Sequence, residues 1–332
     1  MQRLIFTVIV AFLFSLVLGP FVIPVLKRLK VGQTINSFGP RSHSSKQGTA
    51  TMGGVIFAAA AVAAVLIFAA YRGTNAHMLA FCLVTTLVFG AIGFVDDFIK
   101  VTRARSEGLT PKQKLIPQIV FAIGISVFAY MNPYIGSALR VPFTDAELPL
   151  GVFYIPIMAF VIVGVVNSSN LLDGLDGLCA GNSMIMFATF ALICVSLAAK
   201  QDGVDKDLFN TALFSGAMCG ALLGYLRFST HPATTFMGDL GSFTIGGALV
   251  SVAIVTRLAL LLPIVAFTMM LSSVSDLIQI AYMYTHKGRR LFRMTPIHHH
   301  FELSGIPETR IVTAYNMLTA LLCLVALSAF VA

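Results

Sequence analysis

Long apolar stretches separated by short polar segments make up most of this 332-residue chain. A membrane-spanning helix needs about 20 mainly apolar residues, and ten stretches meet that need. They cover residues 4–26, 52–70, 78–97, 114–131, 152–169, 178–199, 208–226, 241–257, 259–285 and 309–330. The pattern therefore predicts an all-α polytopic membrane protein with ten transmembrane helices, built as a single integral membrane domain over residues 1–332.

Two of these boundaries need further argument. The first stretch resembles a signal peptide, but it is too long and lacks an Ala-x-Ala cleavage site, so we interpret it as the first span. The eighth and ninth stretches are separated only at Arg257, and Pro263 suits the first turn of a new helix there.

The composition supports the membrane class. The chain is 57% hydrophobic and only 11% charged, which is not typical of a soluble domain. A net charge of +8 could indicate nucleic acid, but the basic residues occupy short loops between apolar stretches, so no nucleic-acid partner is expected. The five cysteines lie in apolar stretches without a Cys-x-x-Cys pair, and we interpret them as small buried hydrophobic residues.

The distribution of positive charge predicts the orientation. Sixteen of the 22 Lys and Arg residues lie in the loops that follow odd-numbered spans. Cytoplasmic loops carry an excess of Lys and Arg, so both termini are expected outside and these loops inside. The longest outer loop, residues 132–151, contains a stretch that could form a small hairpin.

The most informative polar residues are Asp96 and Asp97, which end the third apolar stretch. A charge at a membrane helix centre costs about 2.5–3.5 kcal/mol, so such acids are usually functional or lie at the boundary. A polar helix stop is the simpler interpretation of one pair. Three other loops on the same predicted side also carry polar motifs, however, at residues 167–177, 236–242 and 296–302. We therefore expect the active site at the cytoplasmic face.

Each of these loops has an alternative interpretation. In 167–177, polar residues recur every three positions, and the required glutamate of an EF-hand calcium loop is absent. Asp239 could simply cap the eighth span. The run His298, His299 and His300 does not have zinc-site spacing, and it could bind a diphosphate or a sugar. The Ser- and Thr-rich first loop suits a phosphate ligand, although a flexible linker is equally possible.

Carboxylates on one membrane face, with cations and an apolar wall nearby, suit bound Mg²⁺, which prefers oxygen ligands. This combination predicts phosphoryl transfer between a soluble nucleotide and a lipid phosphate.

The same motifs, together with residues 51–54, resemble those of the phospho-N-acetylmuramoyl-pentapeptide transferases over essentially the whole chain. These enzymes form a branch of the polyprenyl-phosphate N-acetylhexosamine-1-phosphate transferase superfamily. The resemblance implies an Mg²⁺-dependent transfer of phospho-MurNAc-pentapeptide from UDP-MurNAc-pentapeptide to undecaprenyl phosphate, giving lipid I and UMP. It also implies a homodimer in the bacterial cell membrane.

The resemblance implies roles for individual residues. Asp239 corresponds to the Mg²⁺ ligand, and Asp96 to a base for the lipid phosphate, with Asp97 beside it. Other positions correspond to the metal cleft (Asn170 and Asp173), the uracil pocket (Gly174, Leu175, Asp176 and Phe236), phosphate-neutralising cations (Lys100 and Lys114), and nucleotide-sugar contacts (Lys46, Thr51, Gln279, His298 and His299, with His300 alongside).

The chain departs from the family pattern at two places. Ser229 stands where Asn is common, and Ala50 stands where Pro is common. Two other functions remain open: a sister transferase that uses another UDP-N-acetylhexosamine, and an ion-coupled transporter. The acids crowd one membrane face rather than the midplane, which favours the enzyme.

Overall fold

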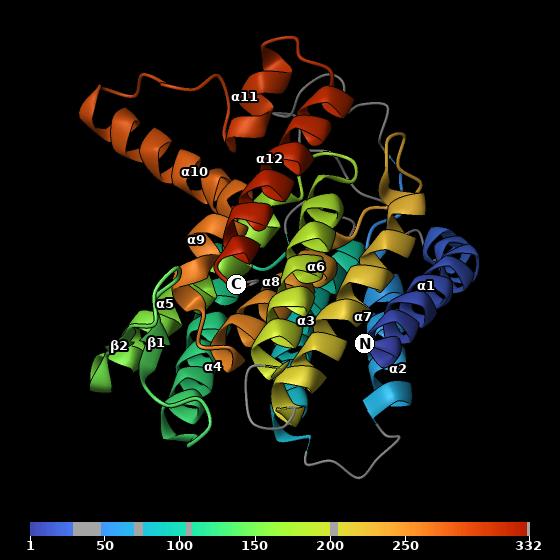
Figure 1. Ribbon diagram of the computed structural model, residues 1–332. Coiled ribbons are helices and arrows are strands. Elements are labelled where there is room, and N and C mark those ends of the chain that lie inside the picture. Colours follow the sequence, from blue (N-terminus) through green and yellow to red (C-terminus); the bar gives the residue numbers. More distant parts are fainter. Residues whose placement is uncertain (29–47, 70–75, 104–107, 200–204, 331–332) are drawn as a thin grey trace.

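The computed structural model describes residues 1–28, 48–69, 76–103, 108–199 and 205–330. Most of its long helices lie side by side, with α11 at one end of the molecule and a small hairpin at the other (Figure 1). The helices are α1 (Gln2–Arg28), α2 (Gly54–Ala69), α3 (His77–Arg103), α4 (Pro111–Met131), α5 (Tyr154–Leu172), α6 (Leu178–Ala199), α7 (Lys206–Ser229), α8 (Gly238–Val255), α9 (Leu262–Val265), α10 (Phe267–Thr285), α11 (Ile297–Leu303) and α12 (Glu308–Ser328).

The helices confirm the membrane class. Within the described ranges, eight are long and apolar enough to cross a membrane, or up to nine if the bent pair α9–α10 forms one span. Helix α2 is apolar as well but has only 16 residues. The chain is thus an all-α polytopic membrane protein, whereas the number ten and the outside location of both termini stay predictions.

The expected single helix over residues 259–285 is wrong. The chain bends by 85° between α9 and α10, because Ala266 leaves the helical region with φ −102° and ψ 24°. Thr268 at the root of α10 donates a 2.7 Å hydrogen bond to Asn182 Oδ1 of α6. The rest of α10 then points away from the other helices (Figure 1). Residues 264–270 contain neither Gly nor Pro, so the apolar pattern gave no sign of the bend.

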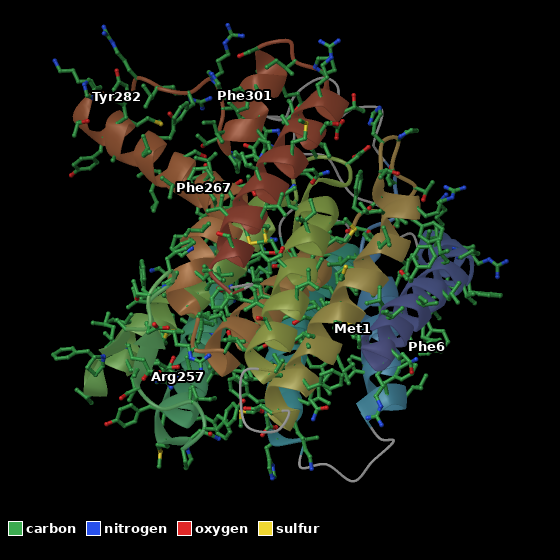
Figure 2. The ribbon with its side chains drawn as sticks, in the orientation of Figure 1. Met1, Phe6, Arg257, Phe267, Tyr282 and Phe301 are labelled. Carbon is green, nitrogen blue, oxygen red and sulfur yellow. The ribbon has the colours of Figure 1, made fainter. Side chains whose placement is uncertain are left out.

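The hairpin expected in the longest outer loop is confirmed. Strands β1 (Ala138–Arg140) and β2 (Glu147–Pro149) pair antiparallel, with Leu139 opposite Leu148. Arg257, just after α8, donates to the Ala138 carbonyl and forms a 2.7 Å ion pair with Glu147. Figure 2 shows Arg257 near this end of the molecule and Phe301 of α11 near the other.

Helix α8 lies at the centre of the fold. In its most apolar stretch, 89% of the residues are buried, against 22% in α1 and in α4. Helix α3 packs along α8, and the contact is close because Gly93 has no side chain. A Cβ atom at Gly93 would overlap the backbone of Asp239. This backbone contact brings the end of α3 to the beginning of α8, where the predicted carboxylates lie.

Candidate active site

Three carboxylates from two helices meet at this contact. Asp96 and Asp97 lie in the last two turns of α3, and Asp239 lies in the first turn of α8. Each offers an oxygen within 4.8 Å of the others. Asp96 and Asp97 are buried, while the Asp239 side chain is 13% exposed. The cluster is therefore formed by residues 142 positions apart in the sequence.

Two lysines neutralise part of this charge. Lys100 Nζ lies 2.6 Å from Asp96 Oδ2 and 2.9 Å from Asp239 Oδ2. Lys114 of α4 lies 3.0 Å and 2.6 Å from the same two oxygens. Three carboxylates thus face two ammonium groups, which leaves one formal negative charge. Such a surplus can be compensated by a bound cation or by protonation.

Hydrogen bonds hold the carboxylates in place. Asn170 at the end of α5 donates to Asp239 Oδ1 at 2.8 Å. The Leu240 N–H donates to Asp97 Oδ2 at 3.0 Å, and the Leu109 N–H donates to Asp96 Oδ1 at 2.7 Å. Helices α3, α4, α5 and α8 all contribute to the site, so its geometry depends on the packing of the whole helical end.

Asp239 does not act as the helix cap considered above. Met237 stands at the N-cap of α8, and the Asp239 carboxylate contacts Lys100, Lys114 and Asn170 instead. An acidic side chain in the first turn is also favoured by the positive end of the helix dipole.

The first loop reaches the site through backbone pairing. The Phe236 N–H donates to the Ala50 carbonyl at 2.8 Å, and the Gly53 N–H donates to the Phe236 carbonyl at 2.8 Å. Between these bonds, Thr51 lies near Gly238, whose φ of +71° favours glycine. A side chain at Gly238 would meet Asp97 as well as Thr51. Thr51 therefore lies beside the carboxylates, its role as a nucleotide-sugar contact stays a prediction, and Lys46 falls outside the described residues.

The loop after α5 is brought to the histidine run. Gly174 lies so close to the rings of His298 and His299 that a Cβ atom there would meet both Nε2 atoms. The two histidines are buried, at 0% and 8% exposure. His299 Nδ1 lies 3.1 Å from Glu302 Oε2. The motifs at 170–177 and 296–302 thus pack against each other, and the expectation that these loops come together is confirmed.

Three predicted contact residues also serve the local fold. Gln279 accepts hydrogen bonds from the Leu291 and Phe292 N–H groups through its Oε1 atom. His300 Nδ1 accepts a hydrogen bond from the Arg293 N–H at 3.1 Å. Leu175 is only 4% exposed and packs into the main apolar core. Gln279 and His300 shape the segment before α11, and Leu175 anchors the loop after α5.

Asp173 differs electrostatically from its neighbours. It caps the C-terminal end of α5 and is partly buried. Loss of hydration raises the pKa of Asp173 to about 8, and the negative charges of Asp239 and Asp97 add to the rise. Lys100 offsets only part of this rise, so Asp173 carries a proton at neutral pH without a bound metal ion, and a metal ion among the carboxylates would favour its charged form.

A second polar cluster was only partly expected from the sequence. Asp176 meets His231 and Glu308, with one possible ligand atom from each lying within 4.8 Å of the others. His231 and Glu308 were not identified by the sequence motifs, because His231 lies in a loop interpreted only for its departure from the family pattern. Glu308 begins the last span, where an acid at a helix N-terminus is ordinary.

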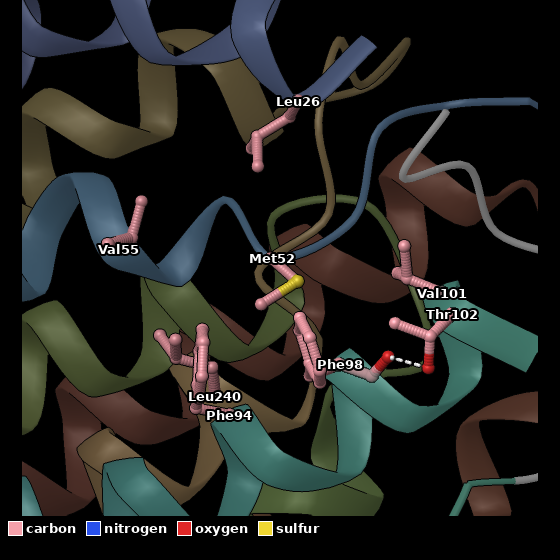
Figure 3. Close-up of a pocket in the computed structure, with 8 residues that line it drawn as sticks. All are labelled: Leu26, Met52, Val55, Phe94, Phe98, Val101, Thr102 and Leu240. Carbon is pink, nitrogen blue, oxygen red and sulfur yellow. Dashed lines mark hydrogen bonds between the residues drawn. The ribbon is translucent and has the colours of Figure 1, made fainter. Parts of the chain in front are cut away.

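An apolar groove lies behind the carboxylate cluster. It has a volume of about 500 Å³ and is formed by α1, α3 and the regions where α2 and α8 begin (Figure 3). It is lined by Leu26, Met52, Val55, Phe94, Phe98, Val101, Thr102 and Leu240. Leu240 contributes its side chain to the groove and its N–H to Asp97. The lining suits a lipid chain rather than a nucleotide.

The carboxylate cluster fits a hard divalent cation. Its donors are carboxylate oxygens from Asp96, Asp97 and Asp239, the ligand type that Mg²⁺ prefers. The surplus negative charge supports the same conclusion. The lysines that now share these oxygens are also placed to bind phosphate oxygens.

The helical fold and this site define an integral membrane enzyme of the glycosyl transferase class, since the profile of Glycosyl transferase family 4 matches residues 78–257. Three relatives share one name, phospho-N-acetylmuramoyl-pentapeptide-transferase. The relative from Thermoanaerobacter sp. (strain X514) is 44% identical over 319 residues, 96% of each chain. The relative from Clostridioides difficile (strain 630) is 40% identical over 98% of each chain, and that from Bacillus subtilis (strain 168) is 40% identical over 95% of this chain and 94% of its own. The chain belongs to the phospho-N-acetylmuramoyl-pentapeptide-transferase family.

Proposed function

We propose that the protein transfers phospho-MurNAc-pentapeptide from UDP-MurNAc-pentapeptide to undecaprenyl phosphate, with lipid I and UMP as products of this step in peptidoglycan biosynthesis. The observation that carries the proposal is the meeting of Asp96, Asp97 and Asp239 with Lys100 and Lys114 at one end of the helices. Membership of the family supplies the substrates.

In the proposed reaction, an oxygen of the lipid phosphate attacks the phosphorus attached to the sugar. A new P–O bond joins the two phosphates, the bond between that phosphorus and the bridging oxygen breaks, and UMP leaves with the bonding electrons. Negative charge grows on the bridging oxygen. Lys100 and Lys114 bind and orient phosphate oxygens and thereby lower the repulsion between the two anionic substrates.

Asp239 is the proposed metal ligand, with Asp96 or Asp97 completing the set. When bound, Mg²⁺ would supply Lewis-acid stabilisation of the diphosphate oxygens. Asn170 would keep Asp239 oriented through the 2.8 Å hydrogen bond to its Oδ1 atom. The remaining carboxylate would accept the second proton of the lipid phosphate, whose pKa is about 6 by analogy with other phosphomonoesters. We propose direct attack, without a covalent intermediate on the protein.

The donor would lie across the surface formed by residues 173–177, Phe236, His298 and His299. Phe236 is partly exposed and offers a ring on which the uracil can stack. The imidazoles of His298 and His299 would face the sugar or the diphosphate, and Lys46 and Thr51 would contact the same ligand from the first loop. Asp173 would line the metal cleft.

Donor choice tests this proposal against the sister transferase. Purified protein is given undecaprenyl phosphate, Mg²⁺ and either UDP-MurNAc-pentapeptide or UDP-GlcNAc, and UMP is measured. We expect turnover with the first donor only, and a severe loss in His298→Ala and in His299→Ala. Equal use of UDP-GlcNAc by the wild type would assign the chain to the sister activity.

We also propose that the protein acts as one unit in the bacterial cell membrane, with the site at the cytoplasmic face, and that it forms a homodimer. Family membership and the exposed apolar side chains of α1 support this arrangement. Cross-linking in native membranes tests the dimer, and labelling of cysteines introduced into the β1–β2 hairpin tests the orientation.

A further inference from the structure

The cluster of Asp176, His231 and Glu308 links three distant segments. Asp176 follows α5, His231 follows α7, and Glu308 is the first residue of α12. His231 Nδ1 lies 3.1 Å from Asp176 Oδ2 and 3.4 Å from Glu308 Oε2. Because a carboxylate can only accept, His231 Nδ1 carries the hydrogen in this contact.

Asp176 is held through both its backbone and its side chain. Its N–H donates to Glu308 Oε1 at 2.6 Å, and its Oδ2 atom accepts a second hydrogen bond from the Ala233 N–H at 3.1 Å. The Asp176 side chain is only 2% exposed. A carboxylate buried to this degree is costly unless it is hydrogen-bonded. These contacts therefore show a side chain engaged by the protein itself.

The contacts fix the distance between two loops. Asp176 follows Gly174, which lies against His298 and His299. Ala233, which is bound by Asp176, stands three residues before Phe236, whose N–H is bound by the Ala50 carbonyl. The histidine side and the Phe236 side of the surface are thus joined through Asp176. Glu308 adds the beginning of α12 as a third support.

We propose that His231 and Glu308 are positioning residues that act through Asp176 to align the two walls of the nucleotide site. This proposal rests on the proposed function. Asp176 then contributes to donor binding through the loop that it holds in place. Loss of either partner leaves the carboxylates and lysines of the reaction centre in place and loosens the grip on the uridine nucleotide.

A divalent cation held by the same three side chains is the competing explanation. Two of the relevant oxygens, Asp176 Oδ2 and Glu308 Oε1, already accept backbone N–H groups. The scaffold therefore accounts for the arrangement without a metal ion.

The test compares His231→Ala and Glu308→Ala with His231→Asn and Glu308→Gln. The Asn amide can replace the donor at Nδ1, and Gln keeps the acceptor oxygen. We expect the Ala variants to raise KM for UDP-MurNAc-pentapeptide, and the inhibition constant of UMP, about tenfold, as for loss of a favourable contact of this strength. The values of kcat and of KM for undecaprenyl phosphate should stay within about twofold, and Asn and Gln should restore most of the loss.

Glu147→Ala provides the matched control, because it removes a carboxylate that pairs with Arg257 at the opposite end of the molecule. It should change no kinetic constant. The proposal is overturned if the Ala variants keep the parental donor KM, if they lose kcat alone, or if added Zn²⁺ or Mn²⁺ controls the donor KM of the wild type but not of the variants. If an Ala variant does not fold, UMP binding is measured instead in His231→Asn, Glu308→Gln and Asp176→Leu. We expect the first two variants to bind UMP with near-parental affinity and Asp176→Leu to bind it more weakly, and equal affinities in all three would overturn the proposal. Wild-type protein that releases no UMP would instead refute the proposed function.

Discussion

At the scale of single residues, the site is a mostly buried cluster of three carboxylates and two lysines. Lys100 and Lys114 share the Oδ2 atoms of Asp96 and Asp239. A buried charge is tolerated only when it is paired or bound to a cation. Substitutions that change the charge of this cluster but keep its packing are therefore expected to have the largest effect on metal binding and turnover.

Asp239→Asn tests the metal assignment. The substitution keeps the shape of the side chain and removes its charge. The affinity for Mn²⁺, used as a probe for Mg²⁺, should therefore fall by about tenfold to a hundredfold. Turnover should be lost while the melting temperature stays near the parental value. Electron paramagnetic resonance of bound Mn²⁺ measures the affinity directly. Asp145→Asn, at an exposed position in the β1–β2 hairpin, is the control, and unchanged Mn²⁺ binding in Asp239→Asn would contradict the assignment.

Asp173→Asn tests the unusual protonation of this loop. In the presence of a metal chelator, Asp173 has a pKa of about 8 in the folded protein, so it keeps its proton up to about that pH. In the unfolded chain, Asp173 loses the proton near pH 4. The folded state then binds more protons, so wild-type stability falls as pH rises from about 4 to 8. The Asn variant lacks this loss. The excess of its melting temperature over that of the wild type should therefore grow from pH 6 to pH 8.5, and equal differences at both pH values would contradict the shift.

At the scale of elements, the site depends on how helices approach each other. The apolar stretches predicted most helices, and the motifs predicted that Asp96, Asp97 and Asp239 belong to one site. The 85° bend before α10 was not predictable, because residues 264–270 lack Gly and Pro. The cluster around His231 and Glu308 was also missed, since long-range hydrogen bonds to ordinary loop and helix-end residues leave no periodic pattern.

Gly93→Ala tests the contact between α3 and α8. The added methyl group would overlap the backbone of Asp239, and overpacking of this kind typically costs about 1–3 kcal/mol. We expect a lower melting temperature and at least a tenfold loss of turnover, because the three carboxylates move apart. The matched control is Gly124→Ala in α4, where a methyl group would meet nothing within 4 Å. That variant should be neutral or slightly stabilised, and equal behaviour of the two variants would refute the explanation.

At the scale of the whole molecule, the helices form a support that holds loops from distant parts of the chain at one end. The buried helix α8 provides Asp239, and less buried helices such as α4 provide Lys114. The end with the hairpin is closed separately by Arg257 and Glu147. This division suits the proposed reaction, in which a protein that lies largely in lipid receives both a water-soluble nucleotide and a lipid substrate.

The most direct test of the central claim is a three-component assay of the purified protein. UDP-MurNAc-pentapeptide, undecaprenyl phosphate and Mg²⁺ are supplied together, and each is omitted in turn, while UMP and lipid-linked product are measured. We predict equal amounts of the two products when all three are present, and none when any one is missing. A stoichiometric burst of UMP without the lipid would refute direct attack. Movement of the intact UDP-sugar into vesicles without chemical conversion would contradict the assignment of the protein as a transferase.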